Sequence, residues 1–200
     1  MSSAWHPDWF LSGILNHHIN QMVDRYSALL ALRIDLSYKK DSIDYQQPDH
    51  HQLEHDVRKL MDDMMLYDAV VGYFWVLEYG EERRYHAHVV LWLDRHYTLA
   101  PFVYAEYAKK YWECITLQDG IFHRCGHKPY YSANISIPVN YSNPMSVDNI
   151  RRVLSYLTKE EQKWTQPIYG CNEVSEHSEQ GRPRNPGVYR YTSPYVRYCL

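Results

Sequence analysis

One stretch of the chain, residues 72–94, constrains the fold more than any other: GYFWVLEYGEERRYHAHVVLWLD. It holds two runs in which aromatic and aliphatic residues alternate, and a polar turn at residues 81–84 separates them. Alternation with a period of two is typical of strands, and two such runs joined by a short polar turn indicate a hairpin. We therefore expect two paired strands at the centre of the fold.

The second run of this hairpin carries a candidate metal site. His86 and His88 lie two residues apart, so their side chains share one face of a strand at a spacing of ~6.6 Å. Glu78 on the first run is expected opposite His86 or His88, and on the histidine face when Trp75 and Leu77 point to the core. Two imidazoles and one carboxylate on an open sheet face form a plausible divalent-metal site with positions left for a substrate.

The His-x-His pair carries little information by itself. With 12 histidines in the chain, about 0.7 such pairs are expected by chance. The surrounding pattern makes it more specific, because a hydrophobic run continues the same strand and a carboxylate lies on the expected partner. An exposed strand face with incidental histidines is the alternative interpretation.

Composition and length indicate a single globular domain over residues 1–200, with 45% hydrophobic residues and a core at residues 26–165. No apolar run approaches the ~20 residues that span a membrane. The first ten residues lack the basic region of a secretion signal. The four cysteines are scattered, which favours reduced thiols and a cytoplasmic protein. The net charge of −3 counts against a sequence-independent nucleic-acid binder.

The periodicities along the chain predict alternating helices and strands. A helix capped by Asp8 is followed by a strand at residues 27–38, a helix at 52–68, the hairpin and a helix at 101–113. A strand or hairpin within residues 115–122, a strand at 131–141 and a helix capped by Ser146 and running to residue 164 complete the order. This order predicts an α+β fold, an antiparallel sheet of about five strands with helices on one face and the other face open. The open face is expected to carry Arg33, Asp35, Glu78, His86 and His88.

The last expected helix supplies a candidate nucleophile. Tyr156 and Lys159 are three residues apart and share one helical face. A tyrosine can attack phosphorus and hold a covalent phosphoester, and an ammonium group can stabilise charge on the phosphate. A metal ion on the sheet would polarise a phosphate oxygen and orient it for in-line displacement.

A second Tyr-x-x-Lys pair lies at Tyr107 and Lys110, so the motif alone does not select the nucleophile. Tyr156 is the preferred candidate because Arg152 and Lys163 flank it on the same helix. A solvated helix face without chemistry is the alternative for either pair.

Together these motifs resemble the HUH endonucleases, specifically the replication initiators of filamentous (inovirus-type) phages and the related YagK/YfjJ C-terminal domain of prophages. RIDLSY at residues 33–38 resembles the first strand motif of that family. The segments at residues 75–94 and 155–163, the latter SYLTKEEQK, resemble its Glu plus His-hydrophobic-His hairpin and its tyrosine helix. The motifs are short, and their combination and order carry the resemblance.

The resemblance implies an RRM-like sheet with Mg²⁺ or Mn²⁺ held by Glu78, His86 and His88. It implies a single-tyrosine enzyme for rolling-circle DNA replication in the bacterial cytoplasm, in which Tyr156, assisted by Lys159, nicks one strand. The products would be a 5′-phosphotyrosine and a free 3′-hydroxyl primer. The implied partners are single-stranded or origin DNA and host replication proteins. Tentative DNA-binding residues are Arg33, Arg152, Lys163 and Arg190. The chain departs from the pattern in its small Ala87 between the histidines and in its acidic balance.

Other interpretations stay open at this point. A domain of the same descent that has lost nicking would act as a DNA-binding or protein-interaction module of a mobile element. A structural zinc site could use Cys114, His123, Cys125 and His127, although their spacings do not match a usual zinc knuckle. The tail at residues 166–200, where arginine and tyrosine interleave, would be a single-strand clamp or an ordinary chain end.

Overall fold

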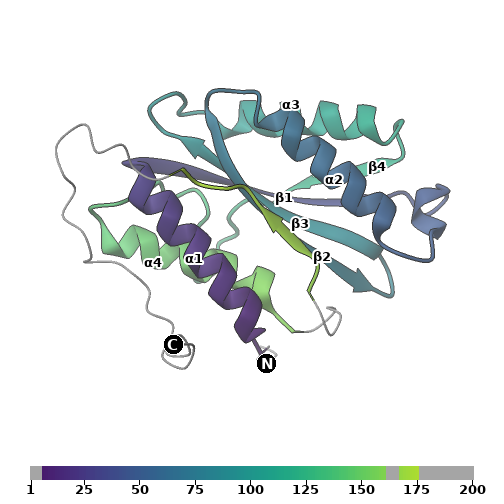
Figure 1. The fold of residues 1–200 in the computed structure, drawn as a ribbon, viewed down its shortest axis with the longest axis horizontal. Coiled ribbons are helices and arrows are strands. Elements are labelled where there is room, and N and C mark those ends of the chain that lie inside the picture. The colour runs from purple at the N-terminus through teal and green to yellow at the C-terminus, as the bar shows by residue number, and fades with distance from the viewer. Residues whose placement is uncertain (1–5, 161–166, 176–200) are drawn as a thin grey trace.

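In the computed structural model, which describes residues 6–160 and 167–175, an antiparallel sheet lies between two pairs of helices (Figure 1). The α-helices of this part are α1 (Trp9–Arg25), α2 (His51–Met64), α3 (Pro101–Ile115) and α4 (Pro144–Leu154). The strands are β1 (Ala28–Tyr38), β2 (Val70–Gly80), β3 (Arg84–Asp94), β4 (Gly120–Arg124), β5 (Val139–Asn140) and β6 (Tyr169–Cys171). Two 3-10 helices are η1 (Asp44–Gln46) and η2 (Ser155–Thr158). The predicted α+β class is confirmed.

The central hairpin predicted from the alternating runs is confirmed as β2 and β3. The strand order is β4-β1-β3-β2-β6, with β5 paired to the start of β1. In the β2–β3 register Glu78 is the direct partner of His86, and His88 is the partner of Val76. On the other side of β3, His88 is the partner of Asp35 on β1. The three inner strands therefore bring one carboxylate from each side to the two histidines.

Helices α2 and α3 cover one face of the sheet, which we call the α2/α3 face. Alternate residues of β3, such as Val89 and Leu91, point to it and are fully buried with Leu60 of α2 and Trp112 of α3. Removing a Val or Leu side chain from water contributes ~1.5–3 kcal/mol. This face therefore holds the larger core, as the alternation of the hairpin predicted.

The opposite face, the α1/α4 face, is covered at one end only. Val90 and Trp92 of β3 are buried there against Ile19 of α1 and Ile150 of α4. The apolar stripes of α1 and α4 need burial, and this end of the sheet supplies it. The expectation of an open face therefore holds only for the other end, where His86 and His88 line a groove.

The starts of two helices are fixed by side-chain caps. The Asp8 carboxylate accepts a hydrogen bond from Leu11 N at 2.7 Å, as the sequence predicted. Helix α4 begins before the expected cap, because Asn143 rather than Ser146 accepts from the first-turn amides. Ser146 instead accepts from Asn140 N at 3.0 Å and anchors the strand before the helix. An N-cap hydrogen bond contributes about 1 kcal/mol.

The strand predicted at residues 131–141 is wrong over most of its length, since only Val139–Asn140 pairs with β1. Asparagine turns replace it. Asn134 N donates to Asn149 Oδ1 at 2.9 Å, and Ser136 N donates to the Asn134 side chain at 2.8 Å. Pro138 has no N–H group to donate to a sheet. These local contacts compete successfully with the ladder that the alternation suggested.

The helix predicted at residues 146–164 also ends early. It is α-helical only to Leu154, continues as η2, and has extended backbone at Lys159. The chain before α1 holds this end in place: Pro7 forms a β-bridge with Lys159, and Asp8 N donates to Thr158 O at 2.6 Å. Contacts with a segment so distant in sequence are invisible to a local helical pattern, which explains the error. Residues 161–164 lie outside the described part of the chain.

The region at residues 115–122, expected as a strand or hairpin, is the end of α3, a turn and the start of β4. Leu117 and Gln118 have positive φ values of 50° and 73° and reverse the chain. Gly120 then begins β4, where a Cβ atom would lie 2.4 Å from Nε1 of Trp112. Glycine is required there because the strand passes directly over the indole ring.

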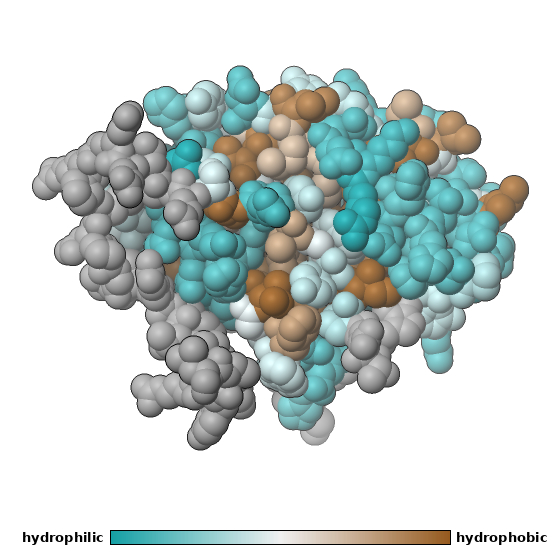
Figure 2. Space-filling view, viewed as in Figure 1, coloured by the Kyte–Doolittle hydropathy of each residue, from teal (hydrophilic) through white to brown (hydrophobic). Residues whose placement is uncertain are grey.

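The surface seen in the view of Figure 1 is mostly hydrophilic, with separate hydrophobic patches (Figure 2). Large apolar side chains that are exposed, such as Leu66 and Leu99, lie in different connections of the fold. Among the described residues, no helix has the length and apolar character needed to cross a bilayer.

Candidate active site

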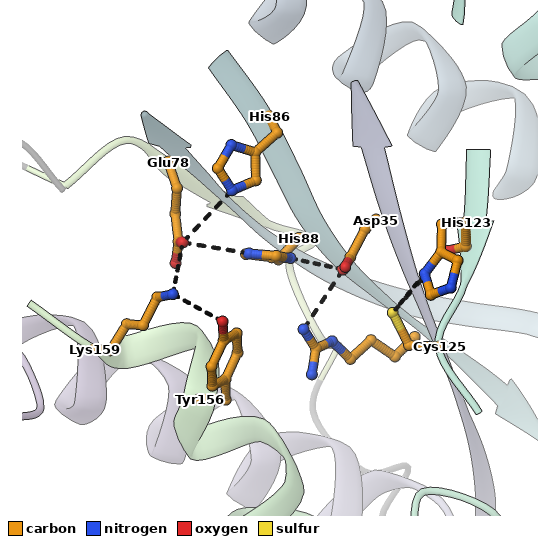
Figure 3. Close-up of polar contacts among 9 residues, drawn as sticks. Asp35, Glu78, His86, His88, His123, Cys125, Tyr156 and Lys159 are labelled. Carbon is orange, nitrogen blue, oxygen red and sulfur yellow. Dashed lines mark hydrogen bonds and ion pairs between the residues drawn. The ribbon is translucent and has the colours of Figure 1, made fainter. Parts of the chain in front are cut away.

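Two histidines and a glutamate meet on the α1/α4 face at the end that the helices leave uncovered (Figure 3). His88 Nε2 lies 3.3 Å and His86 Nε2 lies 3.7 Å from the same oxygen, Oε2 of Glu78. All three side chains are buried. The predicted convergence of these residues is therefore present, and it follows from the register of β2 on β3.

The far side of each imidazole is anchored. His88 Nδ1 lies 2.6 Å from Oδ1 of Asp35, and His86 Nδ1 lies 3.1 Å from the carbonyl oxygen of Arg84. Because a carboxylate and a carbonyl only accept hydrogen bonds, each Nδ1 carries the hydrogen and each Nε2 is directed to Glu78. Such outer contacts fix the tautomer and ring orientation of metal-binding histidines. Asp35, expected on the open face, thus acts through His88.

The two imidazoles differ in electrostatics. Burial lowers the pKa of His86, and the neighbouring His88 lowers it further. Burial also opposes protonation of His88, but the carboxylates of Asp35 and Glu78 outweigh it and raise the pKa of His88. For Asp35 burial is the largest single influence, yet His88 and Arg33 together hold its pKa well below the usual range. Asp35 is therefore a permanent anion beside His88.

Tyr156 and Lys159 lie directly beside this cluster. Lys159 Nζ donates to the Tyr156 hydroxyl at 2.8 Å and lies 3.3 Å from Glu78 Oε2. Burial works against the charge on Lys159, but the Tyr156 hydroxyl and Glu78 outweigh it and raise the pKa of the ammonium group. Lys159 is therefore a cation that links the phenol to the carboxylate of the cluster.

The phenol ring of Tyr156 is held between cationic and aromatic groups. The Arg33 guanidinium lies 4.9 Å from the ring centroid, and the His88 ring meets it edge-on at 5.8 Å. Arg33 also forms an ion pair with Asp35 at 3.5 Å. Tyr156 nevertheless remains 38% exposed, so a ligand in the groove can reach it. Arg33, expected on the open face, is confirmed there.

The donor set of Glu78, His86 and His88 fits a divalent metal ion. One ligand atom from each lies within 4.8 Å of the others. Two imidazole nitrogens and one carboxylate oxygen suit first-row divalent ions. The residues that would hold such an ion are these three.

A groove of about 1390 Å³ runs along this end of the sheet. Its floor includes His86, His88 and Tyr156, and Arg152 lies on its rim. The opposite wall comes from the end of β4 and the loop after it, which were not predicted to contribute: Arg124, Lys128, Tyr130 and Tyr131 line the groove. The interleaving of basic and aromatic residues in RCGHKPYY was the sequence signal that was available for this wall.

The remaining candidates fall elsewhere. Tyr107 lies on α3 and stacks on Tyr67 of α2 with ring centroids 5.1 Å apart, in the cluster of the α2/α3 face. Lys163 and Arg190 lie outside the described residues, as does most of the tail. Of the zinc set, Cys114 is exposed on α3, and neither it nor His127 belongs to the cluster formed by His123 and Cys125. Asp35 completes that cluster instead.

Fold and site together define a class of α+β protein in which a sheet presents a His–His–Glu cluster beside a Tyr–Lys pair. The chain belongs to a family of replication-associated proteins, the ORF2 type, whose model matches residues 32–165. The matched segment contains the whole cluster from Asp35 to Lys159. No curated protein and no solved structure matches the chain. Membership identifies it as a replication-associated protein.

Proposed function

We propose that this protein is a metal-dependent replication initiator that nicks one DNA strand and stays joined to the 5′ end. The observation that carries the proposal is the meeting of Tyr156 and Lys159 with the Glu78, His86 and His88 cluster. The family match supports a role in replication. The substrate would be single-stranded or origin DNA of a phage or prophage.

Tyr156 is the proposed nucleophile. Its phenolic oxygen forms a bond to phosphorus while the bond from phosphorus to O3′ of the preceding nucleotide breaks. The phenol loses its proton and the departing O3′ gains one, so a 5′-phosphotyrosine and a free 3′-hydroxyl result. Lys159, which donates to the phenolic oxygen at 2.8 Å, stabilises the negative charge that develops there.

The cluster on the sheet is the proposed site of Mg²⁺ or Mn²⁺. A bound divalent ion would supply Lewis-acid polarisation of a phosphate oxygen. Asp35 and the Arg84 carbonyl hold the two imidazoles with Nε2 toward Glu78. The groove supports the same function, because basic side chains can follow a phosphate backbone while tyrosines stack on bases.

The experiment is covalent capture of DNA by the full-length protein. The probe is a pool of single-stranded oligonucleotides with randomised central positions, labelled at either the 3′ or the 5′ end, in Mn²⁺. We expect a protein–DNA adduct that survives SDS and carries the 3′ label only, because the downstream part stays on the tyrosine. The 5′-labelled part should be released as a shorter strand.

Matched variants identify the nucleophile. Tyr156→Phe should abolish the adduct, while Tyr107→Phe should retain it because Tyr107 packs on the other face of the sheet. An adduct in Tyr156→Phe would disprove the assignment. If the wild-type protein binds the pool but forms no adduct, the function is that of a DNA-binding module without nicking.

A further inference from the structure

A second cluster of metal-ligating side chains lies next to the candidate active site. It consists of Asp35 on β1, His123 on β4 and Cys125, the residue after β4. One ligand atom from each lies within 4.8 Å of the others. The nicking proposal uses neither His123 nor Cys125, so their convergence needs its own explanation.

The sheet itself creates this cluster. Asp35 and His123 are direct partners in the β1–β4 register, so their side chains share a face. Cys125 N donates to Arg33 O at 2.9 Å, which extends the pairing beyond the end of β4. Cys125 therefore points the same way as His123, and Figure 3 shows both beside Asp35.

We propose that Asp35, His123 and Cys125 bind a zinc ion at a site separate from the Glu78, His86 and His88 cluster. The set supplies one thiolate sulfur, one imidazole nitrogen and one carboxylate oxygen, which are the three ligand types of protein zinc sites. The thiolate and the carboxylate together balance the charge of Zn²⁺. A fourth position stays open for water.

The observed spacing agrees with this chemistry. With Zn–S of about 2.3 Å and Zn–N of about 2.05 Å, tetrahedral geometry places the sulfur and nitrogen ~3.6 Å apart. Cys125 Sγ lies 3.6 Å from His123 Nδ1. Asp35 uses Oδ1 for His88 and for Arg33, so Oδ2 is the ligand atom that we assign to zinc.

The site would fix the wall of the groove to its floor. Cys125 begins the loop that carries Lys128, Tyr130 and Tyr131, and Asp35 is hydrogen-bonded to His88. An ion between them would tie the loop to β1. This metal site does not depend on DNA cleavage, and its test uses no DNA.

The test is a Co²⁺ titration of the full-length protein after chelator treatment under reducing conditions. Co²⁺ replaces Zn²⁺ in such sites, and its bond to a thiolate gives a charge-transfer absorption in the near ultraviolet. We expect this band to saturate at one Co²⁺ per chain and to disappear when Zn²⁺ is added. No band in the wild-type protein would overturn the proposal.

Variants assign the band to this cluster. Cys125→Ser should abolish it, and His123→Ala should weaken Co²⁺ binding by about tenfold or more. A variant with the other three cysteines changed to serine should keep the band, and so should His86→Ala, which removes a ligand of the first cluster. A band that persists in Cys125→Ser, or that is lost in His86→Ala with the fold intact by circular dichroism, would contradict the assignment. Because the band reports a thiolate, its outcome is independent of whether Tyr156 nicks DNA.

Discussion

At the scale of single residues, the chemistry depends on how few groups share Glu78. Its Oε2 lies within 3.3 Å of both His88 Nε2 and Lys159 Nζ. The same carboxylate is therefore the partner of a cation and a proposed metal ligand. An ammonium group this close repels a divalent ion even though it helps the phenol.

Replacing Lys159 separates these two effects. In Lys159→Gln we expect Mn²⁺ to bind about fivefold more tightly, because a repulsion of roughly 1 kcal/mol is removed. Adduct formation should slow by roughly 100-fold, because the charge developing on Tyr156 loses its donor. Calorimetric Mn²⁺ titration and the rate of adduct formation measure the two quantities.

The control for this change is Lys109→Gln, which alters an exposed lysine on α3 and should change neither quantity. Weaker Mn²⁺ binding in Lys159→Gln would show that Lys159 supports the metal site rather than competes with it.

His18 makes stability depend on pH. It is buried under α1 and accepts a hydrogen bond from Trp92 Nε1 at 3.2 Å. Burial, with a smaller contribution from His17, lowers the pKa of His18 to about 4. The unfolded chain takes up this proton near pH 6.5, so stability from the neutral ring is complete above that pH and is lost as the pH falls toward 4.

Between pH 7 and pH 5 the wild-type protein should lose about 2 kcal/mol more unfolding free energy than His18→Gln. Urea denaturation at both pH values measures this difference. His17→Gln, at the exposed neighbouring position, should behave like the wild type. Equal pH dependence in His18→Gln and the wild type would refute the assignment.

At the scale of elements, the hairpin could be predicted because its alternation is local and strong. The residues on its two faces, such as Val89 and His88, were assigned correctly from a period of two. The pairing of Asp35 with His88 needed the order of the strands, which no local pattern contains. The end of α4 likewise depends on Pro7 contacting Lys159, so the extended backbone at Lys159 was missed.

Two glycines test how tightly elements pack. Gly120→Ala should destabilise the fold by roughly 2 kcal/mol, because the new Cβ meets the buried Trp112 ring. Gly13→Ala lies within α1, where nothing approaches within 4 Å, and it should stabilise by roughly 0.5–1 kcal/mol through helix propensity. Urea denaturation compares both with the wild type. A neutral Gly120→Ala would mean that β4 can shift away from α3.

At the scale of the whole molecule, the acidic balance and a nucleic-acid function are compatible because the basic groups are local. Arg33, Arg124, Lys128 and Arg152 line one groove, although the net charge of the chain is −3. Their convergence could not be predicted from the sequence, since they come from β1, β4, the following loop and α4. Only the assembled sheet brings them to one side.

This groove predicts the form of single-stranded DNA binding. Lys128→Ala should weaken binding and reduce the slope of log affinity against log salt by about one, because one phosphate contact is lost. Tyr130→Ala, at a side chain 74% exposed on the groove wall, should cost ~1–3 kcal/mol with the slope unchanged. Fluorescence anisotropy with a labelled oligonucleotide measures both. Tyr97→Ala, also exposed and not among the groove-lining residues, is the control, and an effect there equal to that of Tyr130→Ala would remove the groove from the account.

The central claim is that Tyr156 delivers its phenolic oxygen to a phosphate at the His–His–Glu cluster. The most direct measurement is mass spectrometry of the trapped adduct after nuclease and trypsin digestion. Cleavage after Arg152 and Lys159 gives the peptide VLSYLTK, in which Tyr156 is the one tyrosine. We predict that the added nucleotide mass lies on Tyr156 in Mn²⁺ and is absent from His86→Ala. Nucleotide mass on any other residue, or an undiminished adduct in His86→Ala, would contradict the account.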